Sequence, residues 1–277
     1  MTADGAATES RRGGPSAGRT RRGFVQGFGD RLLEALHFVG EFVSVLARGL
    51  IPGNWRRTMR AEFGFYLYQV GVRAIPVVMI VALLVGIGLV FQIVYWLRFA
   101  GEDERMGEFI VLALIRQIAP VGTVLIIIGR SGSVLVEEVG QMTRSGHTRV
   151  LASQGVDPID LVMIPRAFAV AAAAFLLTLL FMHTALWSGY LAASLAGLAK
   201  RSPDEFTAAV LGIMSLNDYL LLIVKPLLTG YVVGYLSIWF GSRVEHGPQG
   251  IRRALPKAFA TSLIATIAIG ALITALL

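Results

Sequence analysis

Two long apolar runs flank the polar stretch GRSGSVLVEEVGQMTRSGHTRVLASQGVDPIDLVMIPR, residues 129–166. Its charged residues are Arg130, Arg144, Arg149 and Arg166 together with Glu137, Glu138, Asp157 and Asp160. Because unpaired charges are costly in hydrocarbon, this stretch must lie in water or against another protein. It therefore divides the apolar part of the chain and predicts where the chain leaves the membrane.

The composition of the whole chain indicates an integral membrane protein. Of the 277 residues, 55% are hydrophobic and only 16% are charged, and the mean hydropathy is +0.67, well outside the range of soluble domains. The chain has no cysteine and its four histidines are scattered, which argues against a disulfide, a thiolate nucleophile or a zinc site. We expect no metal, no cofactor and no nucleic-acid partner.

Five apolar runs are each long enough to cross a bilayer as a helix rising about 1.5 Å per residue. They are residues 74–96, 107–128, 167–190, 216–240 and 258–277. The predicted fold class is therefore an all-α, polytopic membrane protein, with a single membrane domain over residues 53–277.

The chain before residue 53 differs in character from the membrane domain. Residues 1–23 are basic and rich in Gly, Ser and Thr, a composition that predicts a disordered tail; a transit peptide is the alternative. In residues 24–52 apolar side chains recur every three or four positions among charged ones. This spacing predicts an amphipathic helix lying in the membrane interface, the alternative being a cytoplasmic helix packed on the membrane domain.

The distribution of lysine and arginine predicts the orientation. The chain before the first span is strongly basic, and the fourth connection carries Arg243, Arg252, Arg253 and Lys257 against Glu245. Because basic loops stay on the cytoplasmic side, the N-terminus is predicted inside and the C-terminus outside. The same rule places the stretch 129–166 in the cytoplasm.

Two connections contain helix signals. In the cytoplasmic stretch, residues 131–142 and 148–154 are predicted to form two short helices that project from the membrane domain; a loop folded back on the domain is the alternative. Outside, the run Ser202, Pro203, Asp204 and Glu205 has the serine cap, first-turn proline and acids of a helix start, so a helix should run to about Ile213. Helices that project in this way would give a soluble, energy-supplying partner protein a surface through which to move the membrane domain.

The same region resembles a known family. The runs IRQIAPVGTVLIIIGRSGSVLVEEVGQM, residues 115–142, and QGVDPIDLVMIPR, residues 154–166, are similar to the signature of the MlaE-like (YrbE-type) permeases. The resemblance implies a homodimeric membrane subunit of an ABC transporter in a bacterial inner membrane. It also implies a separate ATPase and an MCE-domain protein as partners, and phospholipid or a related hydrophobic molecule as substrate. Gln117 and Ala119 stand where the family usually has Glu and Gly.

Two sets of candidate site residues follow. Arg116 and Lys225 each lie about nine residues into a span, where a cation costs roughly 2.5–3.5 kcal/mol without a partner. We expect them to hold a lipid phosphate, helped by Gln92 and Gln117; snorkelling, or satisfaction by helix carbonyls, is the alternative. The residues expected to face the ATPase, or to brace the helices that do, are Arg130, Glu137, Glu138, Asp157 and Arg166.

Other functions are weaker interpretations of the sequence. Residues 129–132 spell the G-x-S-G of intramembrane serine proteases, with His183 as the conceivable base. Ser131 falls at the cytoplasmic end of its span and His183 about sixteen residues into the next, so the two lie at different membrane depths and no catalytic residue is assigned. No phosphate loop of the G-x-x-x-x-G-K-[ST] type occurs, so ATP hydrolysis must belong to a partner. A passive channel or assembly scaffold would keep the spans but would not need the projection.

Overall fold

The computed structural model describes residues 33, 36–51, 53, 55–102, 105–155, 157–198, 202–244 and 249–276. The predicted tail, residues 1–23, and the first part of the predicted interfacial helix lie outside this part of the chain. Two units are distinguished, Met1–Ser44 and Val45–Leu277. In the first unit, described residues are helical from 36 onward, and the side chains of Leu36, Val39 and Val43 are exposed.

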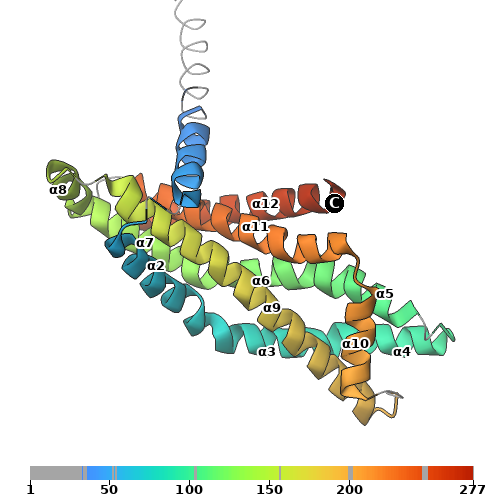
Figure 1. Cartoon of the computed structure of the whole chain (residues 1–277). Coiled ribbons are helices and arrows are strands. Elements are labelled where there is room, and N and C mark those ends of the chain that lie inside the picture. Colours follow the sequence, from blue (N-terminus) through green and yellow to red (C-terminus); the bar gives the residue numbers. More distant parts are fainter. Residues whose placement is uncertain are drawn as a thin grey trace, which may run out of the picture. The chain divides into compact units, whose positions relative to one another are not determined.

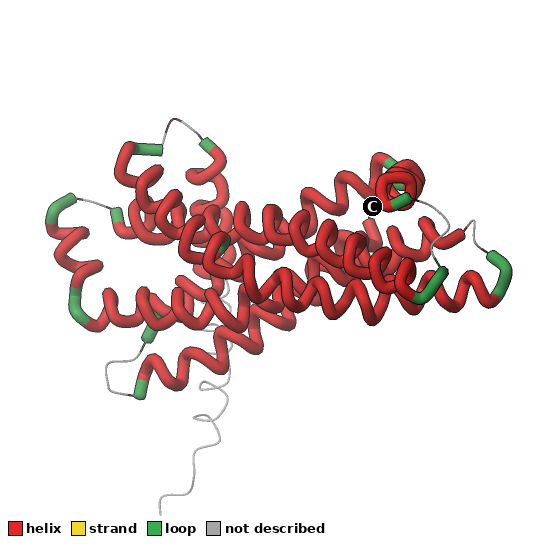
Figure 2. Tube along the Cα trace, turned by 90° about the horizontal axis from the view of Figure 1, so that it is seen from below, coloured by secondary structure: helices red, strands yellow, loops and turns green. Residues whose placement is uncertain are grey.

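The second unit is built from helices, and the described residues include no strand (Figure 2). Five helical runs are long and apolar enough to cross a membrane: Arg57–Phe99, Met106–Arg144, Ile159–Leu195, Leu216–Ser242 and Gly250–Leu276. The predicted fold class, an all-α polytopic membrane protein with five spans, is confirmed.

The first two runs are longer than the predicted spans. The first comprises α2 (Arg57–Val70), η2 (Val72–Ala74), α3 (Ile75–Val85), η3 (Gly86–Val90) and α4 (Phe91–Phe99). The second comprises α5 (Met106–Ile110), η5 (Val111–Ile118), α6 (Ala119–Ile127), η6 (Ile128–Gly132) and α7 (Ser133–Arg144). At 1.5 Å per residue each run is about 60 Å long, twice the hydrocarbon thickness, so their polar ends extend beyond the membrane core.

One sequence expectation differs from the structure at residues 131–142. This segment is not a separate short helix, because the second run continues through it without a break to Arg144. The reason is packing: Leu135, Val136 and Val139 are buried, and α7 packs against α11 (Leu216–Ser242) and α12 (Gly250–Leu276). Only the short α8 (His147–Ser153), which has no buried residue, stands apart at the end of α7 (Figure 1).

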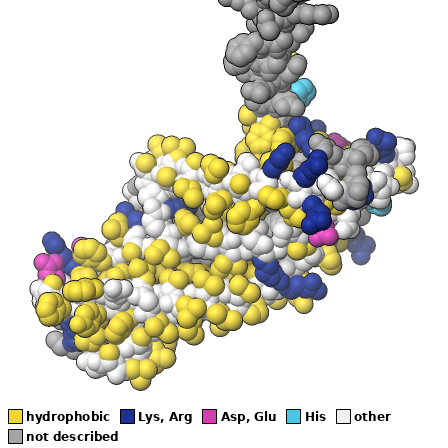
Figure 3. Space-filling model, turned by 180° about the vertical axis from the view of Figure 1, so that it is seen from behind, with side chains coloured by type: hydrophobic (Ala, Val, Ile, Leu, Met, Phe, Trp, Pro, Cys, Tyr) yellow, Lys and Arg dark blue, Asp and Glu magenta, His cyan; other side chains and the backbone are white. Residues whose placement is uncertain are grey.

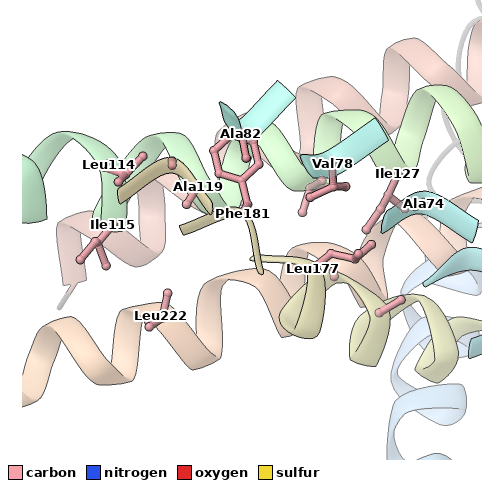
Figure 4. Close-up of a cluster of buried hydrophobic side chains, with 14 of the residues drawn as sticks. Ala74, Val78, Ala82, Leu114, Ile115, Ala119, Ile127, Leu177, Phe181 and Leu222 are labelled. Carbon is pink, nitrogen blue, oxygen red and sulfur yellow. The ribbon is translucent and has the colours of Figure 1, made fainter. Parts of the chain in front are cut away.

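The core lies around α9 (Ile164–Leu195), which follows η7 (Ile159–Met163). α9 packs against α2 and α3 and also against α11. Figure 4 shows Phe181 of α9 beside Ala82 and Ala119, and Phe181 is fully buried. Helices α9 and α11 approach closely at Gly230, where an added Cβ would lie 2.6 Å from the Cβ of Ala174.

The connection between the third and fourth spans forms the helix that its capping signal predicts. α10 runs over Pro203–Ile213, with Ser202 and Glu205 completing a reciprocal capping box, so that prediction is confirmed. α10 packs against α5 and α9.

Large apolar side chains remain exposed on the spans, among them Ile80, Leu84, Ile264 and Ile267. Figure 3 shows one face on which apolar side chains are widespread and Lys and Arg side chains gather in separate patches. A surface this apolar fits hydrocarbon rather than water. The chain is a multi-pass membrane protein.

Candidate functional site: a buried cation centre between three spans

Lys225 of α11 lies at the centre of the candidate site. Its side chain is 1% exposed. The ammonium donates to the carbonyl oxygen of Arg116 at 2.7 Å, to Oε1 of Gln117 at 2.6 Å and to Oγ1 of Thr274 at 2.9 Å. Since an ammonium has three donors, these acceptors use all of them. Lys225 therefore links the second, fourth and fifth spans through polar groups.

The carbonyl acceptor on the second span follows from the sequence around it. In an α-helix the carbonyl of Arg116 would accept from the amide of residue 120, but residue 120 is a proline and has no N–H. This part of the span is also π-helical, a form found mainly as single turns near functional sites. The Lys225 ammonium thus supplies a donor to a carbonyl that lacks its usual one.

On the fifth span, small and hydroxyl residues make room for the lysine. A Cβ at Gly270 would lie 3.3 Å from Cε of Lys225. One turn later, Thr274 donates through its hydroxyl to the carbonyl of Gly270 at 2.8 Å, which leaves its oxygen oriented to accept from Lys225. α12 can therefore lie close to the lysine stem and still offer a polar acceptor.

Arg116 belongs to the same centre through Asp218. Nε of Arg116 donates to Oδ1 of Asp218. The carboxylate is held in place because its Oδ2 accepts from the amide and the hydroxyl of Ser215, both at 2.8 Å, in the capping box that starts α11. Arg116 keeps 34% of its side chain exposed, whereas Asp218 keeps 3%. Arg116 is thus the accessible cation of the centre.

The charges of this centre do not cancel. Arg116 and Lys225 are cations, and the one carboxylate of the centre, Asp218, pairs with Arg116, so the formal sum is one positive charge. The remaining acceptors of Lys225 are neutral. A net positive charge among apolar helices is costly, and an anion that enters would lower that cost. The arrangement can bind a phosphate or carboxylate through Arg116.

The structure brings together three of the four residues predicted for lipid binding. Arg116, Gln117 and Lys225 meet at one place. Gln92 does not join them in the described contacts: it is exposed on α4, which packs against α5 and α9. The sequence interpretation did not include Asp218 and Thr274, although Ser215-x-x-Asp218 repeats the capping signal recognised at Ser202.

A second buried cation, Arg166, lies where α2, α7 and α9 meet. It is 4% exposed and donates to the hydroxyl of Tyr66 at 2.7 Å, and its guanidinium lies over the Tyr66 ring. Tyr66 donates to Oε1 of Glu138. Carboxylate oxygens of Glu138 and Glu62 lie 3.8 and 4.0 Å from Nη2 of Arg166. This cluster fixes the start of α9 against the first two runs.

The five residues predicted for ATPase coupling occupy different environments. Arg166 and Glu138 belong to the buried cluster just described. Nη1 of Arg48 lies 2.9 Å from Oδ2 of Asp157, and hydrogen bonds to Asp157 and Asp160 raise the pKa of Arg48 above its ordinary value.

The other two predicted coupling residues, Glu137 and Arg130, take no part in the Arg166 cluster. Glu137 is exposed and accepts from Gln141 at 3.2 Å, and Arg130 lines a cleft beside α2.

The protease alternative gains no support from the geometry. In the described part of the chain, Oγ of Ser131 has no hydrogen-bond partner. His183 is exposed, and its ring lies 6.1 Å from that of Trp187. A serine nucleophile needs a base within hydrogen-bond reach, and this pair does not provide one.

Comparison with protein families gives an independent result. Residues 63–276 match the model of a family described as permease MlaE. The matched range contains both buried cations, Lys225 and Arg166, and their contacts apart from Glu62.

Individual relatives agree with the family match. A probable ABC transporter permease protein of Synechocystis is 27% identical over 85% of this chain and 86% of its own length. The intermembrane phospholipid transport system permease protein MlaE of Haemophilus influenzae is 24% identical over 92% of this chain and 97% of its own. The chloroplastic protein TRIGALACTOSYLDIACYLGLYCEROL 1 of Arabidopsis thaliana is 26% identical over 81% of this chain and 62% of its own.

Proposed function

The chain belongs to the MlaE permease family, and on that basis we propose that it is the membrane subunit of an ABC transporter that moves phospholipid across the cell envelope. A relative of nearly equal length carries the name of a phospholipid transport permease. In this proposal the chain provides the lipid path, and a separate ATPase subunit hydrolyses ATP.

The observation that carries the substrate assignment is the unbalanced charge of the Arg116–Lys225 centre. Two cations and one carboxylate are held between apolar helices, and Arg116 remains one-third exposed. A phospholipid combines the two properties that this environment favours, an anionic phosphate and long apolar chains. In the proposal Arg116 binds the phosphate directly, Gln117 adds a hydrogen bond, and Lys225 holds the three spans in register.

Energy coupling is assigned to the segment between Arg144 and Arg166. α8 has no buried residue, so its surface is available to an ATPase. Arg48, Asp157 and Asp160 brace the chain that follows α8, and the Arg166 cluster ties the start of α9 to α2 and α7. A movement of α8 caused by the ATPase would therefore be transmitted to α2, α7 and α9 through these ion pairs and hydrogen bonds.

The remaining partners and the orientation complete the proposal. The basic connections are assigned to the cytoplasm and the C-terminus to the outside of a bacterial inner membrane. A second copy of this chain would provide the other half of the lipid path, and an MCE-domain protein would receive or deliver lipid on the outer side.

Copurification and ATPase assays test this function. The full-length chain should copurify with an ATPase subunit, and phospholipid should stimulate ATP hydrolysis by the complex. A matched pair of variants, Arg149→Glu on the exposed surface of α8 and Arg60→Glu on α2, separates docking from a general effect of charge. Loss of copurification in the first alone supports the proposal. A chain that binds no ATPase would favour a passive channel or scaffold.

A further inference from the structure

A cleft separate from the Arg116–Lys225 centre lies between α2 and the η6–α7 segment. Its volume is ≈ 180 Å³, and it is lined by Tyr66, Gln69, Val70, Arg73, Arg130, Ser131, Val134 and Leu135. A cavity needs only roughly 10–15 Å³ to hold one water molecule, so this cleft has room for a larger polar group. It opens because α2 packs on α9, whereas α7 packs on α11 and α12.

The polar groups that line the cleft suit an anion. Arg73 and Arg130 contribute two guanidinium groups, Gln69 contributes an amide, and none of the described lining residues is a carboxylate. The guanidinium of Arg73 has a ring contact with Tyr68, 5.9 Å to the centroid, which leaves its N–H edges available. Guanidinium groups bind phosphate through paired hydrogen bonds.

Ser131 gives a second, independent indication of a ligand. It is 5% exposed, it lines the cleft, and within the described part of the chain its Oγ has no hydrogen-bond partner. Leaving a buried hydroxyl unpaired is unfavourable, and such groups normally have a protein, water or ligand partner. A phosphate oxygen in the cleft would supply that partner.

The position of the two arginines favours the phosphate of a lipid headgroup over a free phosphate ion. Arg73, in η2, lies two residues before the apolar helix α3 begins, and Arg130 lies three residues after the apolar helix α6 ends. Both guanidinium groups therefore lie where apolar spans meet the polar ends of the long helices. This is the depth of lipid headgroups, on the side that the basic connections assign to the cytoplasm.

We propose that this cleft is a second lipid site, which binds the phosphate of an anionic phospholipid in the cytoplasmic leaflet through Arg73, Arg130 and Ser131. Because the cleft is next to Tyr66, a bound lipid would contact the same helix α2 that is tied to Arg166 and Glu138. The site is independent of the transport proposal and would remain if that proposal failed.

Native mass spectrometry of the full-length chain with phosphatidylglycerol in detergent tests the site. All variants are made with Arg116→Gln, so that the central site does not contribute to the signal. Adding Arg73→Gln and Arg130→Gln together should weaken phosphatidylglycerol binding about tenfold or more, as expected for lost charge-assisted hydrogen bonds. Arg60→Gln, at an exposed arginine of α2 that does not line the cleft, is the matched control and should change binding by less than about twofold.

Ser131→Ala provides a test that does not depend on the arginines. It removes an unpaired hydroxyl, so the unfolding temperature without lipid should not fall, whereas phosphatidylglycerol binding should weaken several-fold. Binding unchanged in both the Ser131 and the double arginine variants would overturn the site. Inorganic phosphate alone is the second probe. If it raises the unfolding temperature of the parent but not of the double arginine variant, while the two bind phosphatidylglycerol equally, the site takes a free anion and the lipid assignment is wrong.

Discussion

Lys225 and Arg166 are both buried cations, 1% and 4% exposed, but their surroundings are opposite. Lys225 is surrounded by neutral acceptors, and with Arg116 and Asp218 it leaves an excess of one positive charge. Arg166 faces Glu138 and Glu62, so its cluster has two carboxylates to one cation.

The difference separates a binding centre from a structural one. An excess positive charge inside apolar helices can be neutralised by an anionic ligand, whereas a cation already paired with carboxylates gains nothing from one. The Arg166 cluster is therefore expected to support the fold, and the Arg116–Lys225 centre to bind substrate. The following substitutions test this distinction, beginning with the largest expected effect.

Replacing Arg166 with methionine should destabilise the protein most. The change removes the charged donor of the buried Tyr66 hydroxyl, a hydrogen bond worth about 1.5–3 kcal/mol. The cation facing Glu138 and Glu62 is lost as well, but these carboxylates are 35% and 42% exposed and solvent screens their share of the cost. Thermal unfolding followed by circular dichroism in detergent measures the loss. Arg149→Met, at an exposed position of α8, is the control and should stay within about 0.5 kcal/mol of the parent. Equal stability of the two variants would show that the Arg166 cluster does not support the fold.

Replacing Lys225 with methionine should destabilise the protein less than Arg166→Met does, but should reduce the amount of bound phospholipid more. Three neutral acceptors lose their donor, at about 1–3 kcal/mol for buried groups left unpaired, and the removal of an uncompensated charge offsets part of that loss. Copurified phospholipid, measured as phosphate per protein, should fall at the same time. Lys257→Met, exposed on α12, should alter neither quantity. A Lys225 variant that loses stability but keeps its lipid would make this lysine purely structural.

Replacing Gly230 with alanine tests the contact between the helices that carry the two cations. The new Cβ would meet Cβ of Ala174 at 2.6 Å, so α11 must shift away from α9, at a cost of about 1–3 kcal/mol. Gly212 has no atom within 4 Å of an added Cβ. Its replacement by alanine should instead stabilise α10 by about 0.5–1 kcal/mol. The unfolding temperatures of the two variants should therefore move in opposite directions.

The smallest effect is expected at Arg48, whose ion pairs with Asp157 and Asp160 are exposed on both sides. Arg48→Gln should cost no more than about 1 kcal/mol, and less in high salt, because solvent screens such pairs. If these pairs brace the chain after α8, the stimulation of ATP hydrolysis by phospholipid should fall clearly even though the free energy of unfolding changes little. A loss of stability comparable with that of Arg166→Met would contradict the assignment of Arg48 to the surface.

The sequence predicts the membrane part of this fold well because long apolar runs have few alternatives in a bilayer. It predicts the polar end of the second run poorly. Glu137 and Glu138 suggest a segment that has left the helical body, whereas Leu135, Val136 and Val139 of the same segment pack inward against other helices. Which face of a mixed helix is covered depends on distant elements, and local periodicity does not reveal them.

The candidate site was predictable in part for the same reason. Arg116 and Lys225 stand out because charges inside spans are expensive, and Pro120 indicates which carbonyl lacks a donor. Asp218 carries a visible capping signal, yet its pairing with Arg116 joins positions 102 residues apart. Thr274 and the exposure of Gln92 depend on helix packing alone, which no local pattern specifies.

ATP-driven phospholipid transfer in proteoliposomes that contain the chain and its copurified ATPase tests the central claim most directly. The parent complex should transfer phospholipid only with ATP. Arg116→Gln should still assemble with the ATPase but transfer at least about tenfold more slowly, since the charge-assisted contact to phosphate is lost. Equal transfer by the parent and the Arg116 variant would contradict the account.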